Sequence, residues 1–277
     1  MSGPSAPALL VGCGKMGGAL LAGWLARGTA GADTPVLIIE PASAATAPFR
    51  SKPGVTILSA ADEIPDAPQP RVVVFAVKPQ GMDQVVPAYR RFVSPATVFL
   101  SIAAGRPIAF FERHLGAAAS VVRTMPNTPA AIGRGISVAC ANRHVAAGQR
   151  ELCGGLLSAV GEVAWIDDER LLDPVTAVSG SGPAYVFLLV EALAEAGEAA
   201  GLPADLAMRL ARATVTGSGE LLHQAPEPAE QLRRNVTSPG GTTAAALEVL
   251  MARRGGLAAL LKRAVAAATR RSRELAG

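Results

Sequence analysis

Short apolar runs alternate with helical or turn-forming stretches along the first part of the chain. The runs occupy residues 8–11, 36–39, 55–58, 72–77, 97–102 and 120–123, and most are rich in Val, Ile or Leu. Near-continuous apolar runs of this kind are typical of parallel strands that are buried on both faces of a sheet. Two more strands, at 136–140 and 163–166, flank a helix expected over 146–160. The pattern predicts a doubly wound α/β architecture for this part of the chain.

The pattern changes near Asp168, and the rest of the chain is predicted to be wholly helical. Helices are expected at residues 185–200, from Pro203 to about His223, at 244–253 and at 257–275, with a break rich in Gly and Ser at 179–185. The helices are broadly apolar and rich in Ala, which favours close packing between subunits as well as within one. We therefore predict two domains, residues 1–166 and 167–277, in a protein that forms oligomers.

The most apolar helical segment, residues 185–200, is interrupted by Glu191, Glu195 and Glu198. We expect it to be a buried amphipathic helix rather than a membrane span, because a span tolerates few charges. Residues 1–7 contain no basic region, and the apolar run that follows them is too short for a signal peptide. The chain is therefore expected to be soluble.

Composition argues against several classes of function. The net charge is +4, but aromatic residues make up only 4% of the chain, so the scattered arginines do not indicate a nucleic-acid surface. Cys13, Cys140 and Cys153 form no C-x-x-C pair, which favours a reduced, cytoplasmic compartment. The three histidines lie far apart in sequence without the spacing of metal ligands. We predict neither a metal nor a nucleic-acid partner.

A glycine-rich turn, Gly12-Cys13-Gly14-Lys15-Met16-Gly17, follows the first predicted strand and opens a helix. Glycines allow a tight turn and a close approach of a pyrophosphate, and the helix N-terminus offers free N–H groups and its dipole. The next strand ends at Glu40, whose carboxylate suits the ribose hydroxyls of a dinucleotide and disfavours a 2′-phosphate. Ser43 and Arg50 follow it and are suited to a phosphate. The sequence predicts a dinucleotide site and leaves NADH and NADPH open.

Polar or small residues follow three other predicted strands, at 78–80, 103–105 and 124–129. Ligands of doubly wound sheets bind at the carboxyl ends of the strands, so these residues are expected to form one rim. Lys78, which precedes a proline, is expected to face the cleft, with a solvated surface position as the alternative. Asn127, between two prolines, either fixes a rigid turn or hydrogen-bonds the nicotinamide amide.

A second glycine turn lies in the helical part, within Val236-Thr237-Ser238-Pro239-Gly240-Gly241-Thr242-Thr243. The paired glycines permit positive φ, and hydroxyls on both sides are able to cap the following helix, so several N–H groups can converge on one point. Such a point binds an anion, for example a carboxylate. The alternative is an ordinary capped turn, because the same residue types are common turn formers.

Five motifs together resemble the pyrroline-5-carboxylate reductase family, in order and over nearly the whole chain. They are Gly12-x-Gly14-x-Met16-Gly17, Val77-Lys78-Pro79-Gln80, Arg123-x-Met125-Pro126-Asn127-Thr128-Pro129, Ser179-Gly180-Ser181-Gly182-Pro183-Ala184-Tyr185 and the stretch from Val236 to Thr243. The resemblance implies a Rossmann-like N-terminal domain and an all-α C-terminal dimerisation domain. It also implies reduction of 1-pyrroline-5-carboxylate to L-proline with NADPH or NADH, in a homodimer that assembles further, for example to a decamer.

The resemblance also implies roles for individual residues. Thr243 would be the catalytic donor at the imine nitrogen, and the preceding loop would bind the substrate carboxylate. The substrate-binding residues would be Ser238, Gly240, Gly241, Thr242, Ser179 and Ser181, although the last two serines are equally suited to capping the helix break. The cofactor-binding residues would be Gly12, Gly14, Lys15, Met16, Gly17, Glu40, Ala76, Lys78, Pro79, Ala103 and Asn127.

Two departures from the family pattern concern the cofactor. Glu40 stands where NADPH users of the family often carry Asn-Arg or small polar residues, and residues 61–63 lack the Asn that many members place near the ribose. Another two-domain imine or β-hydroxyacid dehydrogenase is the alternative enzyme, but hydroxyacid enzymes use a Lys general acid in the helical domain, which here contains Lys262 alone. A non-catalytic dinucleotide-binding regulator would carry a damaged substrate loop, whereas residues 238–243 are intact.

Overall fold

The computed structural model describes residues 6–276 and divides them into two compact units. One unit is the chain up to Gly180 together with the segment from Thr269 onward, and the other is Ser181–Ala268. The stretch 167–180 therefore groups with the sheet, whereas the sequence suggested a boundary after residue 166. The assignment of separate functions to 1–166 and 167–277 stays a prediction. Of the stretch in which no signal peptide is expected, residues 1–5 lie outside the described residues.

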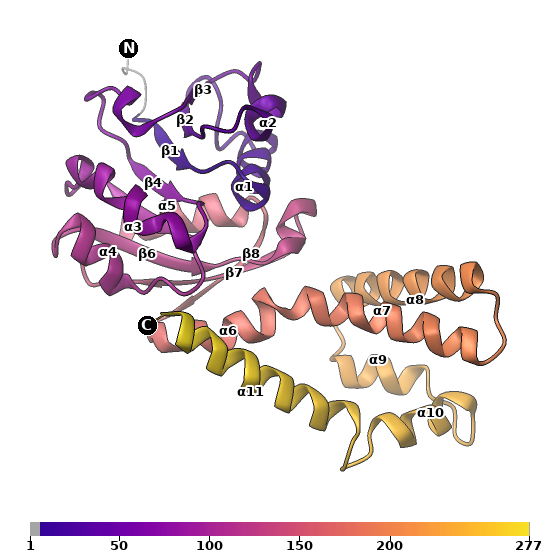
Figure 1. Ribbon diagram of the computed structural model, residues 1–277. Coiled ribbons are helices and arrows are strands. Elements are labelled where there is room, and N and C mark those ends of the chain that lie inside the picture. The colour runs from indigo at the N-terminus through magenta and orange to yellow at the C-terminus, as the bar shows by residue number, and fades with distance from the viewer. Residues whose placement is uncertain (1–5, 277) are drawn as a thin grey trace. The chain divides into compact units, whose positions relative to one another are not determined.

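The first unit is built on an eight-stranded sheet (Figure 1). Its strands are β1 Ala8–Val11, β2 Val36–Ile39, β3 Val55–Leu58, β4 Val72–Phe75, β5 Val98–Ser101, β6 Ser120–Met125, β7 Gly135–Ala141 and β8 Gly161–Ile166. Their order is β3-β2-β1-β4-β5-β6-β7-β8, and the first six are mutually parallel. β7 runs antiparallel to β6 and parallel to β8. The doubly wound α/β prediction is confirmed, with the strand order reversing between β1 and β4.

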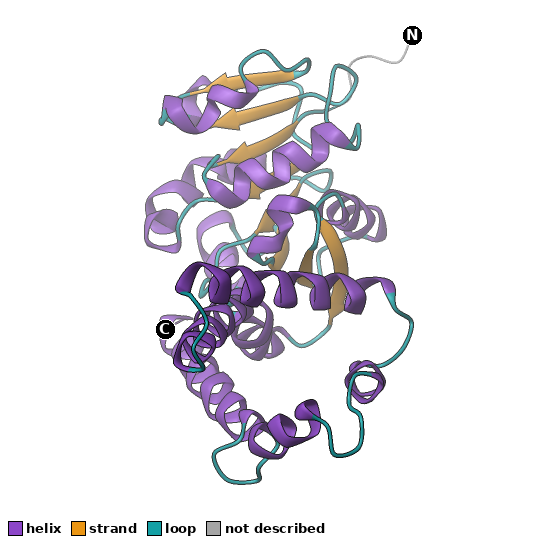
Figure 2. Ribbon diagram, turned by 90° about the vertical axis from the view of Figure 1, so that its right-hand side faces the viewer, coloured by secondary structure: helices purple, strands orange, loops and turns teal. Residues whose placement is uncertain are grey.

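The helices of this unit pack against the sheet (Figure 2). They are α1 Lys15–Ala26, α2 Ser43–Thr46, α3 Met82–Val85, α4 Ile108–Leu115, α5 Ala147–Ser158 and α6 Leu172–Val175. α3 continues as a 3-10 helix over Val86–Phe92, so this segment is α-helical only in its first turn. Pro87 lies at the start of this 3-10 stretch, and its missing N–H disfavours continued α-helical bonding.

The core consists of two layers, one on each face of the sheet. On one face, Leu20 and Trp24 of α1 pack with Leu156 of α5, and the Trp24 indole N–H donates to the Leu156 carbonyl oxygen at 2.8 Å. On the other face, the Phe75 ring packs against those of Tyr89, Phe99 and Phe111. Because side chains alternate across a strand, β1 sends Leu10 into the first layer and Leu9 into the second. This rigid sheet fixes the ends of the strands, where the site lies.

The second unit is helical, as predicted. It contains α7 Gly182–Ala199, α8 Ala204–Gln224, α9 Ala229–Asn235, α10 Thr242–Leu250 and most of α11 Leu257–Ala276. α7 and α8 lie side by side (Figure 1), where Gly197 allows close approach: a Cβ there would lie 3.2 Å from the Ala207 Cβ. α9 was not predicted, because its charged sequence shows no apolar periodicity.

The apolar side chains of α7 are largely exposed in the single chain. Phe187 and Leu188 are both 62% exposed, and Ala194 is the buried residue of this helix. The expectation of a buried helix is therefore wrong for one chain taken alone. The helical segment Glu169–Ala199 is long and apolar enough to cross a membrane, with a mean hydropathy of 1.4. Length and composition are weak evidence for a span, and the exposed side chains require a cover of some kind.

Candidate cofactor and substrate sites

In the glycine turn after β1, the backbone lies close to the backbone at Ala76 and to the start of α1. Gly12 has a φ of +92°, and a Cβ there would lie 2.8 Å from the Val77 side chain and 2.9 Å from the Ala76 carbonyl. A Cβ on Gly17 would collide with the Gly12 carbonyl oxygen. Gly14 is the N-cap of α1 and has no side chain to cap it. The backbone N–H groups of the first turn of α1 therefore have no side-chain cap and are able to bind a ligand. We call the turn Gly12–Gly17 with these N–H groups the glycine cradle, because a side chain at Gly12 or Gly17 would not fit.

Glu40 at the end of β2 is joined to this turn. Its carboxylate accepts hydrogen bonds from the backbone N–H of Cys13 at 2.8 Å and of Ala42 at 2.9 Å. Burial, with a further contribution from the Glu40 charge, raises the pKa of the Cys13 thiol to about 11. Sequence reasoning missed this link, since nothing in the local pattern pairs Glu40 with Cys13. The predicted role of Glu40 toward ribose hydroxyls stays a prediction.

A cavity of about 520 Å³ opens at the carboxyl ends of the strands. Its lining residues lie on the turns that follow β1, β4, β5 and β6, and one more, Gly180, follows α6. The lining residues are Gly14, Lys15, Met16, Ala76, Val77, Lys78, Pro79, Ile102, Ala103, Ala104, Met125, Pro126, Asn127, Thr128 and Gly180. The lining includes most of the predicted cofactor residues, Lys78 among them, but not Gly12, Gly17 or Glu40. Their binding to a cofactor stays a prediction.

Asn127 has a structural role in this wall. Its side-chain oxygen accepts a hydrogen bond from the Ile136 N–H at 2.9 Å, and its backbone oxygen accepts from Ala130 N–H at 3.1 Å. Asn127 thus fixes the turn between β6 and β7, one of the two roles that the sequence left open. A further contact of its side-chain amide with the nicotinamide stays a prediction.

A part-buried ion pair links β6 to the segment that follows β8. Arg123, 6% exposed, donates from Nη1 to Glu169 Oε1 at 2.8 Å, and the same oxygen accepts from the Ile108 N–H at 2.7 Å. The pair joins β6 and the start of α4 to the segment that leads into α6. An ion pair of this kind across 46 positions of sequence cannot be inferred from local pattern.

Ser179 lies in a π-helical turn, Thr176–Gly180. Its hydroxyl oxygen is buried and has no hydrogen-bond partner among residues 6–276. The next residue, Gly180, lines the cavity, and a Cβ there would collide with the Met125 methyl group. Ser181 is the N-cap of α7 but makes no side-chain cap bond. The capping role considered for Ser181 is therefore wrong, and π-turns of this kind recur at functional sites.

The predicted substrate loop lies in the helical unit, at the start of α10. Gly240 has a φ of +68°, and the Gly241 N–H donates to the Ser238 carbonyl oxygen at 3.0 Å. The N-cap is Gly241, without a side-chain bond, so the expected hydroxyl cap is not formed. Thr243 is half-buried in the first turn, where backbone N–H groups have no partner within the helix. The loop geometry suits an anion, and its binding residues stay predictions.

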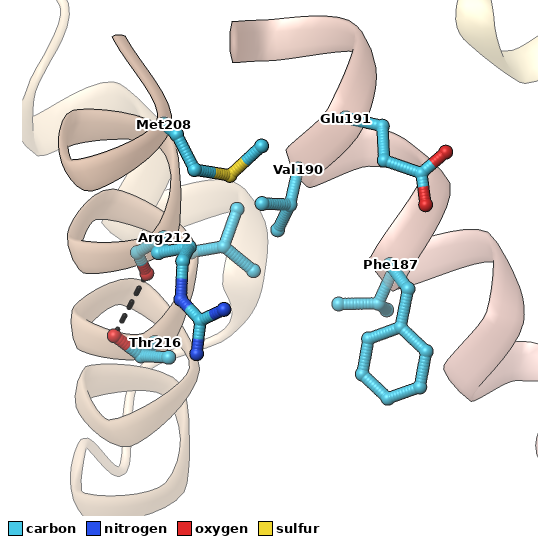
Figure 3. Close-up of a pocket in the computed structure, with 8 residues that line it drawn as sticks. Phe187, Val190, Glu191, Met208, Arg212 and Thr216 are labelled. Atoms are coloured by element: carbon cyan, nitrogen blue, oxygen red, sulfur yellow. Dashed lines mark hydrogen bonds between the residues drawn. The ribbon is translucent and has the colours of Figure 1, made fainter. Parts of the chain in front are cut away.

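The helical unit also contains an apolar groove between α7 and α8 (Figure 3). Its volume is about 420 Å³, and its lining includes Phe187, Val190 and Met208, with Glu191 and Arg212 as its charged members. It contains none of the residues predicted to bind substrate or cofactor. Among residues 6–276, no group of three or more His, Cys, Asp or Glu side chains is placed to hold a metal ion.

Comparison with known proteins agrees with this arrangement. Residues 169–275 match the family profile described as pyrroline-5-carboxylate reductase dimerisation, and residues 8–105 match the one described as NADP oxidoreductase, coenzyme F420-dependent. The chain is 44% identical to the pyrroline-5-carboxylate reductase of Pseudomonas aeruginosa, over 96% of this chain and 95% of that protein. The chain belongs to the pyrroline-5-carboxylate reductase family. The resemblance that the motifs predicted is confirmed.

Solved structures and a further relative extend the similarity. The chain is 38% identical to the Synechocystis reductase, over 96% of this chain and 97% of that protein. The Coxiella burnetii reductase structure has 33% identity and a TM-score of 0.89, over 99% of this chain and 100% of that one. The Plasmodium falciparum structure, with NADP bound, has 28% identity and a TM-score of 0.79, over 100% of both chains. The protein is an NAD(P)H-dependent oxidoreductase.

The dimerisation profile explains the exposed helices. It covers α7 and α8, whose apolar side chains a single chain leaves uncovered. A homo-oligomer covers such faces by contacts between subunits. The apolar pattern predicted that these side chains are buried, because the same pattern results from burial within one chain and from burial between two chains.

Proposed function

We propose that the protein reduces 1-pyrroline-5-carboxylate to L-proline by hydride transfer from NAD(P)H. The observation that carries the proposal is the similarity to pyrroline-5-carboxylate reductases over 96% of the chain. The glycine cradle at the carboxyl end of β1 and the Ser-Pro-Gly-Gly loop at the start of α10 support the proposal, because the reaction requires one site for a dinucleotide and one for a carboxylate.

NAD(P)H supplies the hydride, which goes from its C4 to the imine carbon while the nitrogen gains a proton. The products are L-proline and NAD(P)⁺. Because the substrate imine is readily protonated in solution, the reaction requires no protein acid with a strongly shifted pKa. The protein's task is to hold substrate and cofactor in reacting geometry, which accounts for much of the acceleration in such enzymes.

On the cofactor side, the amides of the first turn of α1 hold the pyrophosphate. Lys78, Pro79, Ala103 and Asn127, which line the cavity, contact the nicotinamide in this proposal. Glu40 accepts from ribose hydroxyls with the lone pairs that its two backbone bonds leave over. The negative charge of Glu40 disfavours a 2′-phosphate. Ser43 and Arg50 favour one, and the Arg50 guanidinium donates to the Ser43 carbonyl oxygen at 3.4 Å. Parallel titrations with NADH and NADPH measure which effect is larger.

On the substrate side, the amides at the start of α10 hold the carboxylate, and the Thr243 hydroxyl is placed at the imine nitrogen. Ser238, Gly240, Gly241 and Thr242 shape the loop. Ser179 and Ser181 contribute hydroxyls to the substrate pocket. A helix N-terminus favours an anion through its unpaired N–H groups and its dipole, which supports the carboxylate assignment.

The direct test is to follow oxidation of NADH and NADPH by the purified protein, with and without 1-pyrroline-5-carboxylate, and to identify L-proline as the product. Turnover only with the substrate is the expected result. Tight cofactor binding without turnover would instead favour a non-catalytic regulator, and turnover with a β-hydroxyacid would favour the alternative dehydrogenase.

Thr243→Ala tests the donor. We expect kcat/KM for the substrate to fall about 10- to 100-fold, with little change in NAD(P)H affinity, because the hydroxyl acts at the imine. Thr243→Ser is the matched control, since it keeps the hydroxyl and should retain most of the activity. An unchanged rate in the alanine variant would remove Thr243 from this role.

We also propose that the protein is a cytoplasmic homodimer that assembles to a larger ring, for example a decamer, without membrane or nucleic-acid partners. The exposed apolar faces of α7 and α8 support subunit contacts. Light scattering on protein purified without detergent gives the mass directly. A monodisperse oligomer is expected, whereas a monomer, or solubility that depends on detergent, would contradict the proposal.

A further inference from the structure

Arg106, on the loop between β5 and α4, joins two walls of the cofactor cavity. Its Nε and Nη2 donate to the Pro79 carbonyl oxygen at 3.0 and 2.8 Å, and Nη2 also donates to Asp83 Oδ2 at 2.7 Å. Pro79 lines the cavity from the turn after β4, and Ala103 and Ala104 line it from the loop that carries Arg106. One side chain therefore ties together two turns that no strand pairing holds.

The Arg106 side chain is itself held in place. Its guanidinium lies 4.7 Å from the centre of the Phe110 ring, which belongs to the core. Asp83 is also approached by His114, with 3.7 Å between Oδ1 and Nε2. The Arg106 side chain is only 25% exposed. A planar, fork-shaped donor held on an aromatic face and paired with a carboxylate has little freedom to swing away.

The position of the Pro79 carbonyl affects the conformation of the Lys78–Pro79 turn. β4 ends at Phe75, and the Ala76 N–H still donates to the Val11 carbonyl oxygen at 2.8 Å, so the turn itself begins at Val77. Lys78 is extended, with φ −62° and ψ 144°, and Pro79 then opens a 3-10 turn that closes with the Gly81 N–H on the Lys78 carbonyl oxygen. The Pro79 carbonyl oxygen accepts the Met82 N–H as well as the two Arg106 bonds, and because proline fixes its own φ, these bonds together orient the Lys78 backbone. Arg106 is thus placed to set where Lys78 meets the cavity.

We propose that Arg106 is a positioning residue for the cofactor, which keeps the Lys78–Pro79 turn in its binding conformation before NAD(P)H arrives. The inference rests on the proposed function only in taking the cavity as the cofactor site. Arg106 does not line the cavity and acts through Pro79. A preformed wall saves the ordering cost that a loose turn would add to binding, so its loss weakens the affinity for the cofactor rather than the chemistry.

The test is a set of variants titrated with NADH and NADPH, followed by the fluorescence of the bound reduced cofactor. For Arg106→Ala we expect the Kd to rise about tenfold, the size of effect typical for loss of hydrogen bonds from a charged group. The KM for the proposed imine substrate should stay within about twofold, because the substrate loop is not touched. Arg106→Lys keeps the charge beside Asp83 but not the fork, so it should recover part of the affinity.

Two further variants separate positioning from general stability. Asp83→Asn leaves both bonds to Pro79 and should raise the Kd only about threefold or less. Arg113→Ala removes the same charge from an exposed position on α4 and should leave the Kd unchanged. The melting temperature of each variant is measured beside its Kd, and partial recovery in Arg106→Lys keeps the test valid if the alanine variant folds poorly.

An unchanged Kd in Arg106→Ala would overturn the proposal, as would an equal rise in Arg113→Ala. A parallel rise in the Kd of the cofactor and the KM of the substrate, together with a lower melting temperature, would assign Arg106 a merely structural role. Cofactor titration needs no substrate. A protein whose NAD(P)H affinity depends on Arg106 but which fails to reduce 1-pyrroline-5-carboxylate would therefore overturn the proposed function and leave this inference standing.

Discussion

Replacement of Gly17 by Ala tests whether the helix after the glycine turn must lie against the turn itself. A Cβ on Gly17 would collide with the Gly12 carbonyl oxygen and would lie 3.1 Å from the Ala76 Cβ and 3.2 Å from the Gly12 carbonyl carbon. Carbon atoms prefer separations of about 3.5–4.0 Å, and the carbonyl belongs to backbone that cannot rotate away. We therefore expect α1 to retreat from the turn, at an overpacking cost of about 1–3 kcal/mol.

The adjacent glycine is a matched control. A Cβ on Gly18 would lie 3.6 Å from the Cys13 carbonyl oxygen and 3.8 Å from the Phe49 ring, which are ordinary contacts. Both substitutions remove a glycine from the same helical turn and gain up to about 1 kcal/mol of helix propensity. That gain cancels in the comparison, so the unfolding free energies of Gly17→Ala and Gly18→Ala should differ by the overpacking cost alone.

The assay combines urea unfolding, followed by circular dichroism, with NADH titration. Gly18→Ala should be as stable as the parent or slightly more so, and Gly17→Ala should be about 1–3 kcal/mol less stable than Gly18→Ala. Displacement of the first amides of α1 should also raise the Kd for NADH about tenfold in Gly17→Ala alone. Equal stability and equal affinity in the two variants would refute the reasoning that close backbone packing holds the cradle.

Three other predictions concern individual side chains. Trp24→Phe removes the indole bond to the Leu156 carbonyl and should lower the unfolding free energy by about 2–3 kcal/mol, measured in urea; a loss below about 0.5 kcal/mol would contradict the role of that bond. Glu40→Gln should lower the ratio of the Kd values for NADPH and NADH, because a negative charge near the 2′ position is removed; an unchanged ratio would place Glu40 away from that position. Burial raises the pKa of Cys13 from the usual 9.0 to about 11 and that of Cys153 to about 12. The unfolded chain therefore loses these protons first, so the unfolding free energy should fall as pH rises from about 9 to 11, and substitution of both thiols by Ala should flatten that decline measured by denaturant titration.

Much of the fold could be predicted because its signals are local. The strands from Ala8–Val11 onward show as apolar runs, and the helices of the second unit show as periodic stretches between Gly and Pro. Errors lay at the ends, as in the helix expected over 244–253 and found at Thr242–Leu250, and in α9, whose charged sequence shows no apolar face. The direction of β7 was not predicted, since an apolar strand has the same pattern in either direction.

The turns of the candidate site were predicted, but the long-range hydrogen bonds that hold these turns were not. Glycine and proline reveal turns because only certain backbone conformations suit them, so Gly12, Lys78 and the loop at Gly240 were found. The hydrogen bond from the Cys13 N–H to the Glu40 carboxylate joins residues 27 positions apart, and the bond from Arg106 to the Pro79 carbonyl oxygen also spans 27 positions. No local pattern records such a pairing, because it depends on which strand ends lie next to each other.

The sequence by itself determined most of the strands and helices in their order along the chain, the two glycine turns and the family. These follow from periodicity and backbone preference, which act over a few residues, and from motifs read in order along the chain. Only the tertiary structure decided that Glu40 holds the cradle, that Asn127 fixes its turn, and that Phe187 and its neighbours are left uncovered. The reason is physical: a hydrogen bond or a buried face depends on positions in space, and the folded chain sets those positions through contacts between distant residues.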